Sequence, residues 1–393
     1  MPWKEKTVEG SRIEFVERVL AKEASKSALC REYGISRVTG DKWLKRYLNG
    51  EEMGDRSRAP MHTPNRISPE AEERIVQARL KEPAIGAIKT RIMLINEGWE
   101  NPPATSTINE VFRRNGLITK QASQAAQHHI RFEKDEPNDM WQADFKGNFL
   151  MRDNNRCHPL SIIDDCSRAC LCADAKENEQ LKSTKESFIQ TFRELGLPKV
   201  LLCDNGTPWG SSQSTSITRF DVWLMELGVL CMHIRAQHPQ TQGKVERFNG
   251  SYKRERLAFY TPKDIKDAQR CRLEYKEFYN NVRPHYSLNM DVPAKHYVPS
   301  SRTYFEEIPK WEYESGGHLR KIKSSGYLTY DGQGYFLSEG LGEKEVMLYH
   351  DEKQNDIVNI VFRQFRVAKL NLSTKTVMSR RVYLLHDDPR EKL

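Results

Sequence analysis

The spacing of hydrophobic residues changes twice along this chain, and these changes limit the folds that it can adopt. From residue 11 to about 115, apolar side chains recur every three or four positions, as in amphipathic helices. From about 140 to 280, apolar runs typical of strands alternate with helical segments, and from about 318 onward only short strands are indicated. With 393 residues, the chain is expected to form two or three domains rather than one.

The charge of the chain is basic and unevenly distributed. Lys and Arg number 62 against 54 Asp and Glu, a net charge of +8, and residues 1–130 hold 22 of the bases against 17 of the acids. This balance favours a polyanionic partner, with nucleic acid as the first candidate. No long apolar run or signal peptide pattern occurs, so we expect a cytoplasmic protein. Its eight scattered cysteines are expected to stay reduced, and the absence of a Cys-x-x-Cys pair disfavours zinc.

The segment 11–48 predicts three short helices with a sharp turn before the third. Gly34 suits a positive φ and Ser36 suits a helix N-cap, which together form a helix-turn-helix signature over domain 1–50. The third helix would enter a DNA major groove. Its candidate DNA contacts are Arg37, Thr39, Lys42, Lys45 and Arg46. An ordinary helical subdomain with solvated charges is the alternative.

A second helical pattern follows a basic linker, 51–67. The linker carries Arg56, Arg58 and Arg66, which suit either a minor-groove arm or a passive tether. Over 68–118, Ser68-Pro69-Glu70 marks the start of a helix and two further helices follow. The last of these offers Asn109, Arg113 and Arg114 to DNA. Two such modules in tandem favour DNA recognition.

The fold class expected for the chain is multidomain, with all-α modules followed by an α/β core and a small β domain. After a second linker, 119–137, residues 138–300 predict five strands and four helices. Over 318–380, several short strands and an Asp331-Gly332 turn predict a small closed β barrel.

Three carboxylates stand out in the α/β region. Asp144 lies in the first strand, Asp204 ends a later apolar strand, and Glu246 falls in the first turn of a helix. Ligands of open α/β sheets usually bind at the carboxyl ends of strands. Taken singly, each carboxylate could equally be an ordinary surface acid.

Four motifs in fixed order carry a resemblance to a known family. They are WQADFKG at 141–147, CDNGTPW at 203–209, HPQTQGKVERFNG at 238–250 and YNNVRPHYSLNMDVPAKHY at 279–297. Together they resemble the catalytic core of DDE insertion-sequence transposases, the type related to retroviral integrases (rve). The resemblance implies a ribonuclease-H-like fold for 138–300 and a catalytic, metal-binding triad of Asp144, Asp204 and Glu246.

Two details of the motifs bear on this resemblance. The 41 residues between Asp204 and Glu246 exceed the commonest family spacing, which leaves the subgroup open. Asp164-Asp165 offers a competing acid pair, but its setting matches the family's turn between the second and third strands, so we interpret both as turn residues.

A carboxylate triad suits phosphodiester chemistry. Two divalent ions about 4 Å apart can activate the attacking oxygen and stabilise the leaving oxygen. Mg²⁺ (or Mn²⁺) prefers oxygen ligands. With two ions per active site, Asp144 would bridge both, while Asp204 and Glu246 would each complete one site.

The helix after Gly243 is expected to combine metal binding with DNA contact. Helical spacing turns Val245, Phe248 and Tyr252 toward the core and places Glu246, Asn249 and Lys253 in an exposed row. The candidate DNA contacts of this segment are Arg247, Asn249, Lys253 and Arg254, with Lys244 and Lys146 as weaker candidates.

The expected function is that of a DNA transposase. It would bind double-stranded terminal inverted repeats and use Mg²⁺ for strand cleavage and for transfer into target DNA, as the resemblance implies. Joining two element ends needs a homo-oligomer, at least a dimer on DNA, in the bacterial cytoplasm and at the nucleoid when bound. Two alternatives are a domesticated DNA-binding regulator without catalysis and a hydrolytic nuclease without strand transfer.

Overall fold

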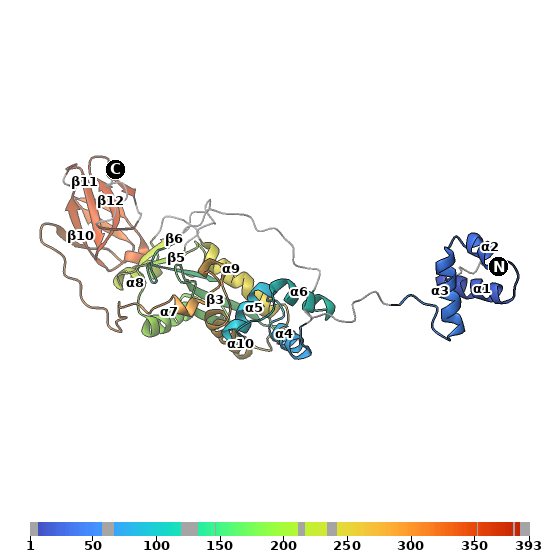
Figure 1. The fold of residues 1–393 in the computed structure, drawn as a ribbon. Helices are drawn as coiled ribbons and strands as arrows, with labels where there is room; N and C mark the ends of the chain where they lie inside the picture. Colours follow the sequence, from blue (N-terminus) through green and yellow to red (C-terminus); the bar gives the residue numbers. More distant parts are fainter. Residues whose placement is uncertain are drawn as a thin grey trace. The chain divides into compact units, whose positions relative to one another are not determined.

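The structure is a computed structural model that describes residues 7–56, 67–118, 133–145, 147–210, 217–233, 242–351, 353–379 and 382–385. The chain divides into two compact units, Met1–Ile67 and Ser68–Leu393 (Figure 1). Among the helices in the described ranges, none is both long enough and apolar enough to cross a membrane.

The first unit contains the three predicted helices, α1 (Val8–Leu20), α2 (Lys26–Glu32) and α3 (Arg37–Leu48). Ser36 caps α3 by accepting a bond from the backbone of Thr39, and Gly34 adopts a φ of 63° in the turn, as expected. Gly40 allows α3 to approach α2 closely, because an added Cβ would lie 2.7 Å from Cys30 Sγ.

The second unit begins with another three-helix module, α4 (Pro69–Lys81), α5 (Ala87–Asn96) and α6 (Thr105–Arg114). Ser68 caps α4, and proline occupies the first helical position, as predicted. The module packs on the α/β region, since Ile85 belongs to the same buried cluster as Phe248 of α9. Glu82 also pairs with Arg256 at 2.8 Å.

The α/β region is built on one mixed sheet. Its strands are β1 (Met140–Phe145), β2 (Phe149–Leu150), β3 (Arg156–Asp164), β4 (Cys170–Lys176), β5 (Val200–Cys203) and β6 (Leu230–His233). The main order is β4-β3-β1-β5-β6, in which β1, β3 and β4 run antiparallel while β5 and β6 run parallel to β1. This topology confirms the ribonuclease-H-like fold that the motifs implied.

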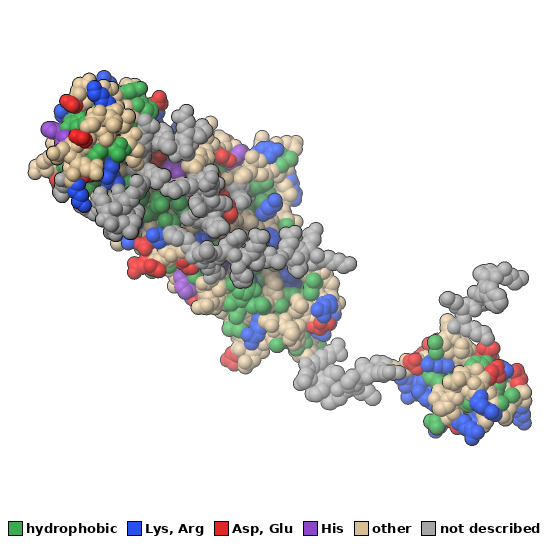
Figure 2. All heavy atoms as spheres, turned by 90° about the horizontal axis from the view of Figure 1, so that it is seen from above, with side chains coloured by type: hydrophobic (Ala, Val, Ile, Leu, Met, Phe, Trp, Pro, Cys, Tyr) green, Lys and Arg blue, Asp and Glu red, His purple; other side chains and the backbone are tan. Residues whose placement is uncertain are grey.

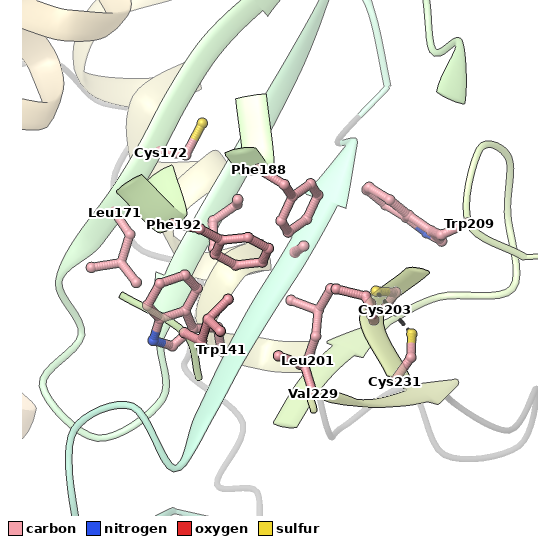
Figure 3. Packing of buried hydrophobic residues seen from close by; sticks show 14 of the residues in the cluster. Trp141, Leu171, Cys172, Phe188, Phe192, Leu201, Cys203, Trp209, Val229 and Cys231 are labelled. Carbon is pink, nitrogen blue, oxygen red and sulfur yellow. Dashed lines mark hydrogen bonds between the residues drawn. The ribbon is translucent and has the colours of Figure 1, made fainter. Parts of the chain in front are cut away.

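Helices cover both faces of this sheet. On one face, Phe192 of α7 (Leu181–Leu195) packs against Trp141 (Figure 3). The rings of α8 (Arg219–Glu226) pack in turn against those of α7. On the other face lie α9 (Gly243–Tyr252) and α10 (Ile265–Asn281). Alternation along β1 therefore points Trp141 and Ala143 to the first face and Gln142 and Asp144 toward α9.

The helix predicted over 244–259 is shorter than expected. The α-helical part ends at Tyr252, and a π-helical turn, η2 (Lys253–Leu257), follows it. Two 3-10 turns, η3 (Tyr286–Leu288) and η4 (Pro293–Lys295), follow α10.

The C-terminal region consists of short strands, but the prediction of a closed barrel was wrong. Its strands are β7 (His318–Lys321), β8 (Tyr327–Tyr330), β9 (Gln333–Phe336), β10 (Glu345–His350), β11 (Ile357–Phe362), β12 (Phe365–Asn371), β13 (Thr376–Ser379) and β14 (Tyr383–Leu384), with the 3-10 turn η5 (Glu339–Leu341) after β9. Within the described residues, one sheet has the order β13-β12-β11-β10-β7, with β14 on β12, and β8–β9 forms a separate hairpin. The hairpin contacts β7 and β13 without joining their ladder, so both sheets stay open.

Candidate active site

Strand register brings Asp144 and Asp204 to the same edge of the sheet. Parallel pairing of β1 with β5 aligns Trp141 with Leu201 and Gln142 with Leu202. Asp144 and Asp204 each follow the last of these pairs by two residues, toward the carboxyl end of the strand. Because the carboxyl ends of parallel strands meet at one edge, both carboxylates lie where ligands of such sheets usually bind.

The loop after β5 fixes the orientation of Asp204. Its Oδ1 accepts bonds from the backbone N–H of Gly206 at 3.0 Å and from Trp209 Nε1 at 2.7 Å. The Trp209 ring is buried and stacks on Phe145 of β1. A Cβ at Gly206 would lie 3.1 Å from both carboxylate oxygens, so glycine leaves room beside this acid.

The start of α9 is attached to β1. Gln142 Oε1 accepts bonds from the backbone N–H groups of Lys244 and Val245, each at 3.3 Å. Gln242 Nε2 donates to the carbonyl of Ala143 at 2.8 Å. Glu246, the next residue of the helix, is exposed in its first turn, as expected.

Asn249 does not belong to the exposed row in which the sequence placed it. Its side chain is only 5% exposed, and its Nδ2 donates to Asp144 Oδ2 at 3.1 Å. Its Oδ1 accepts a bond from Ser161 Oγ at 2.7 Å. The reason is that α9 lies against β1 and β3 on this side, whereas Glu246 and Lys253 remain exposed. Residues three apart share a helix face, so Glu246 lies one turn from the position that contacts Asp144.

The carboxylate oxygens of Asp144, Asp204 and Glu246 do not all lie within 4.8 Å of one another. Among the described residues, a trio of ligand atoms within 4.8 Å of one another occurs instead at Asp221, Cys231 and His233. Two ions about 4 Å apart require ligands distributed around them rather than one shared point. The all-oxygen donor set of the triad fits Mg²⁺, a hard cation.

Lys244 and the acid pair have structural partners. Asp165 accepts bonds from Lys244 Nζ at 2.5 Å and from Gln142 Nε2 at 2.7 Å. Asp164 accepts bonds from the backbone of Asn138 and from Ser167 in the turn. The side chain of Lys244 is only 11% exposed, and its ammonium group is paired with Asp165. The residue predicted to contact DNA therefore already has an anionic partner within the protein.

The predicted DNA contacts on α3 fall into two groups. Arg37, Lys42 and Lys45 are exposed, while Thr39 is half-buried and its hydroxyl bonds Ser36. Basic and acidic side chains are mixed on the surface of the first unit (Figure 2).

Arg46, in contrast, is buried at 8% exposure. It donates to the carbonyl of Gly54 at 3.1 Å and lies over the Trp43 ring, because the chain after α3 folds back on this helix. Arg56 is exposed beside Glu51. Arg58, Arg66 and Lys146 lie outside the described residues.

On α6, all three predicted DNA contacts are exposed. Arg114 donates to Glu72 of α4, and Arg113 pairs with Glu110 on its own helix. Asn109 lines a cleft.

That cleft has a volume of about 870 Å³ and lies between the second helical module and the α9–α10 side of the core. Its walls include four basic side chains, Lys89, Arg247, Arg254 and Arg283. Arg283 is already neutralised, since its Nη2 and Nε donate to the buried Glu255 at 2.7 and 2.8 Å.

The sequence did not indicate Lys89, because the cleft unites segments far apart in the chain. Its Nζ lies 5.4 Å from the centre of the Tyr286 ring. Burial, together with nearby Arg283 and Arg254, lowers the pKa of Lys89 to about 7. A bound anion would restore its charge.

The segment Arg283-Pro284-His285 is also buried, and its side chains contact other parts of the protein. The ring of His285 packs against Tyr279 with centroids 4.5 Å apart. Burial and the positive charges of Arg283 and Lys89 lower the pKa of His285 to about 3, so this ring is neutral.

Three family models match parts of the chain. Residues 134–239 and 227–293 match family models described as integrase core domain, and residues 11–61 match one described as helix-turn-helix domain. The chain is 23% identical over 238 residues to an uncharacterized 31.7 kDa protein of insertion element IS407 from Burkholderia multivorans, covering 58% of this chain and 82% of that protein. It is 24% identical over 159 residues to an uncharacterized 39.2 kDa protein of insertion element IS476 from Xanthomonas euvesicatoria, covering 40% and 44%.

Solved structures give weaker matches. The catalytic core domain of HTLV-2 integrase in complex with magnesium is 17% identical, covers 41% of this chain and 97% of its own, and has a TM-score of 0.31. The simian T-cell lymphotropic virus intasome in complex with PP2A regulatory subunit B56 gamma is 15% identical, covers 74% and 96%, and has a TM-score of 0.34. These sequence matches support an integrase-type transposase of the insertion-sequence family, with a helix-turn-helix domain followed by an integrase core.

Proposed function

We propose that this chain binds the terminal inverted repeats of its element and catalyses Mg²⁺-dependent DNA strand cleavage and strand transfer. The observation that carries this proposal is the edge shared by Asp144 and Asp204, beside which the helix bearing Glu246 is attached through Gln142. A regulator without catalysis would not need these three acids together.

Asp144, Asp204 and Glu246 would hold two Mg²⁺ ions. When bound, the ions supply activation of the attacking oxygen and stabilisation of the leaving oxygen. The protein orients the ligands in advance, because Asn249 holds Asp144 and the Gly206 loop holds Asp204. Such orientation before binding lowers the cost of assembling the site.

DNA would contact the exposed basic residues of both units. Arg37, Lys42 and Lys45 of α3 suit bases and phosphates of a major groove. Phosphates nearer the cut would meet Arg247, Lys253 and Arg254, and the cleft would admit backbone beside Lys89. Joining two ends would require a homo-oligomer, at least a dimer.

The test is an incubation of the full chain with an end duplex, a target plasmid and Mg²⁺. We expect a shortened end and a joined product, both lost in Asp144→Asn while duplex binding persists. The matched control is Asp135→Asn, at an exposed aspartate. Cleavage without joining would favour a nuclease, and binding without cleavage would favour a regulator.

A further inference from the structure

Three side chains with metal-binding atoms meet where β6 and α8 come together, and the thiol of Cys203 on β5 lies beside one of them. Cys203 ends β5, Cys231 and His233 lie on β6, and Asp221 lies in the first turn of α8. The ligand atoms of Asp221, Cys231 and His233 lie within 4.8 Å of one another. The sulfur of Cys203 is 4.0 Å from that of Cys231 (Figure 3).

Two of the distances between these atoms are close to those of a tetrahedral zinc site, while Cys203 Sγ lies more than 4.8 Å from at least one of the other ligand atoms and would have to move toward them. With Zn–S near 2.3 Å and Zn–N near 2.0 Å, two sulfurs are separated by about 3.8 Å and a sulfur and a nitrogen by about 3.6 Å. The corresponding distances are 4.0 Å for Cys203–Cys231 and 3.7 Å from Cys231 Sγ to His233 Nε2. Asp221 Oδ1 lies 2.8 Å from that nitrogen, so it would move by roughly half an ångström to bind zinc.

The surrounding bonds orient the ligands for a metal. His233 Nδ1 lies 3.1 Å from the carbonyl oxygen of Asp204, which leaves Nε2 for the ion. Asp221 Oδ2 accepts bonds from the backbone N–H and hydroxyl of Thr218, while Oδ1 faces the ring. A metal-bound histidine and carboxylate typically have such second partners.

Burial favours a closed, structural site. The exposed fractions of Cys203, Asp221 and Cys231 are 0%, 5% and 9%. A disulfide between the two cysteines would need their sulfurs about 2.0 Å apart. Both cysteines also belong to the hydrophobic core on this face of the sheet.

We propose that Asp221, Cys231 and His233, with Cys203 moving toward them as the fourth ligand, bind a structural Zn²⁺ ion. Two sulfurs, an imidazole nitrogen and a carboxylate oxygen form a tetrahedral set that suits zinc and does not suit Mg²⁺. The ion would join β5, β6 and α8, and through His233 it would fix the backbone of Asp204. This site lies beyond the proposed DNA chemistry and does not depend on it.

The first test uses the tag-free full chain, purified under reducing conditions without chelator. Elemental analysis should find one zinc per chain that persists through gel filtration. Replacement by Co²⁺ should give the intense visible absorption of tetrahedral cobalt and a thiolate-to-cobalt charge-transfer band. Zinc far below one per chain, with no such bands after Co²⁺ is added to chelator-treated protein, would overturn the proposal.

Variants assign the ligands. Cys231→Ser and Cys203→Ser should lower the zinc content by at least tenfold, whereas the matched control Cys271→Ser should retain it. Asp144→Asn should also retain zinc, whether or not the chain is a transposase. Zinc retained at one per chain in both ligand variants would contradict the assignment.

A measurement on the unaltered chain covers the case in which those variants fail to fold. Alkylation mapped by mass spectrometry should leave Cys203 and Cys231 unlabelled until a chelator is added, and label both afterwards. Labelling that the chelator does not change would count against the zinc site.

Discussion

Asn249 Nδ2 donates a hydrogen bond to Asp144 Oδ2 at 3.1 Å, and both side chains are buried. This bond joins α9, which carries Glu246, to the strand that carries Asp144. It continues through Ser161 to Arg272, whose Nη2 donates to the Ser161 hydroxyl at 2.8 Å. The amide of Asn249 therefore links Asp144 to the helix that carries Glu246.

Replacing Asn249 by Ala should weaken Mg²⁺ use more than DNA binding. The change removes a donor from Asp144 and an acceptor from Ser161, at a cost of about 1–3 kcal/mol in the free energy of unfolding. Asn249 acts as a positioning residue, so the Mg²⁺ concentration for half-maximal cleavage should rise. Cleavage titrated with Mg²⁺ measures this, with Asn355→Ala at an exposed site as the control. An unchanged Mg²⁺ dependence would indicate a merely structural role.

Replacing Lys89 by Gln should weaken DNA binding and lower its dependence on salt. If Lys89 contacts one phosphate, the slope of log affinity against log salt should fall by about 1. Fluorescence anisotropy over a salt series measures the slope. Lys81→Gln, at an exposed lysine of α4, should leave it unchanged if only the cleft is used.

The same residue predicts a pH dependence of DNA affinity. Burial and the positive charges of Arg283 and Arg254, opposed by Glu255, lower the pKa of Lys89 to about 7. Phosphate favours the charged lysine, so binding takes up a proton once the pH exceeds 7. Affinity should therefore fall as the pH rises above about 7, and Lys89→Gln should flatten this fall. A wild-type chain with pH-independent affinity from pH 6 to 9 would contradict the placement.

Replacing Glu255 by Gln should destabilise the second unit. It leaves Arg283 buried without its anion, which typically costs about 3–5 kcal/mol. Although burial opposes ionisation, Arg283 lowers the pKa of Glu255 below its usual 4.5. The stabilisation is therefore present above that pH and lost as the pH falls through the lowered pKa. Urea unfolding at pH 7 and pH 4 measures both effects, and the exposed Glu274→Gln should change neither strongly.

Replacing Gly40 by Val should destabilise the first unit and abolish its DNA contacts. The new Cβ would meet Cys30 Sγ at 2.7 Å and Phe15 Cζ at 3.1 Å, and overpacking of this kind costs about 1–3 kcal/mol. Thermal unfolding followed by circular dichroism measures the loss. Gly250→Ala is the helical control, since nothing lies within 4 Å of its added Cβ.

Local pattern predicted the elements well, because caps and periodicity act within a few residues. Ser36 and Ser68 each cap the helix that the sequence assigned to them, and the strand that leads to Asp204 ends where expected. The register between β1 and β5 then follows from the fold.

Which side chains contact one another in the folded chain could not be predicted in the same way. Helical spacing separates the faces of α9, but it does not say that one polar position would be buried against β3, as Asn249 is. The sequence also does not show that Lys244 pairs with Asp165. Nor does it show that the chain after α3 covers Arg46. The zinc-like cluster has no sequence signature, because its ligands come from three elements spread over 203–233.

In the proposed reaction, the ion pair between Arg256 and Glu82 would fix the distance between two parts of the bound DNA. It fastens the second helical module to the segment that follows Glu246, so the bases that α6 contacts and the bond to be cut would lie a fixed number of base pairs apart. The second helical module would then determine the position of the cut as well as recognise the DNA sequence. One base pair inserted between its recognition sequence and the element end should move the cut by one base pair, even though the original end sequence is still present.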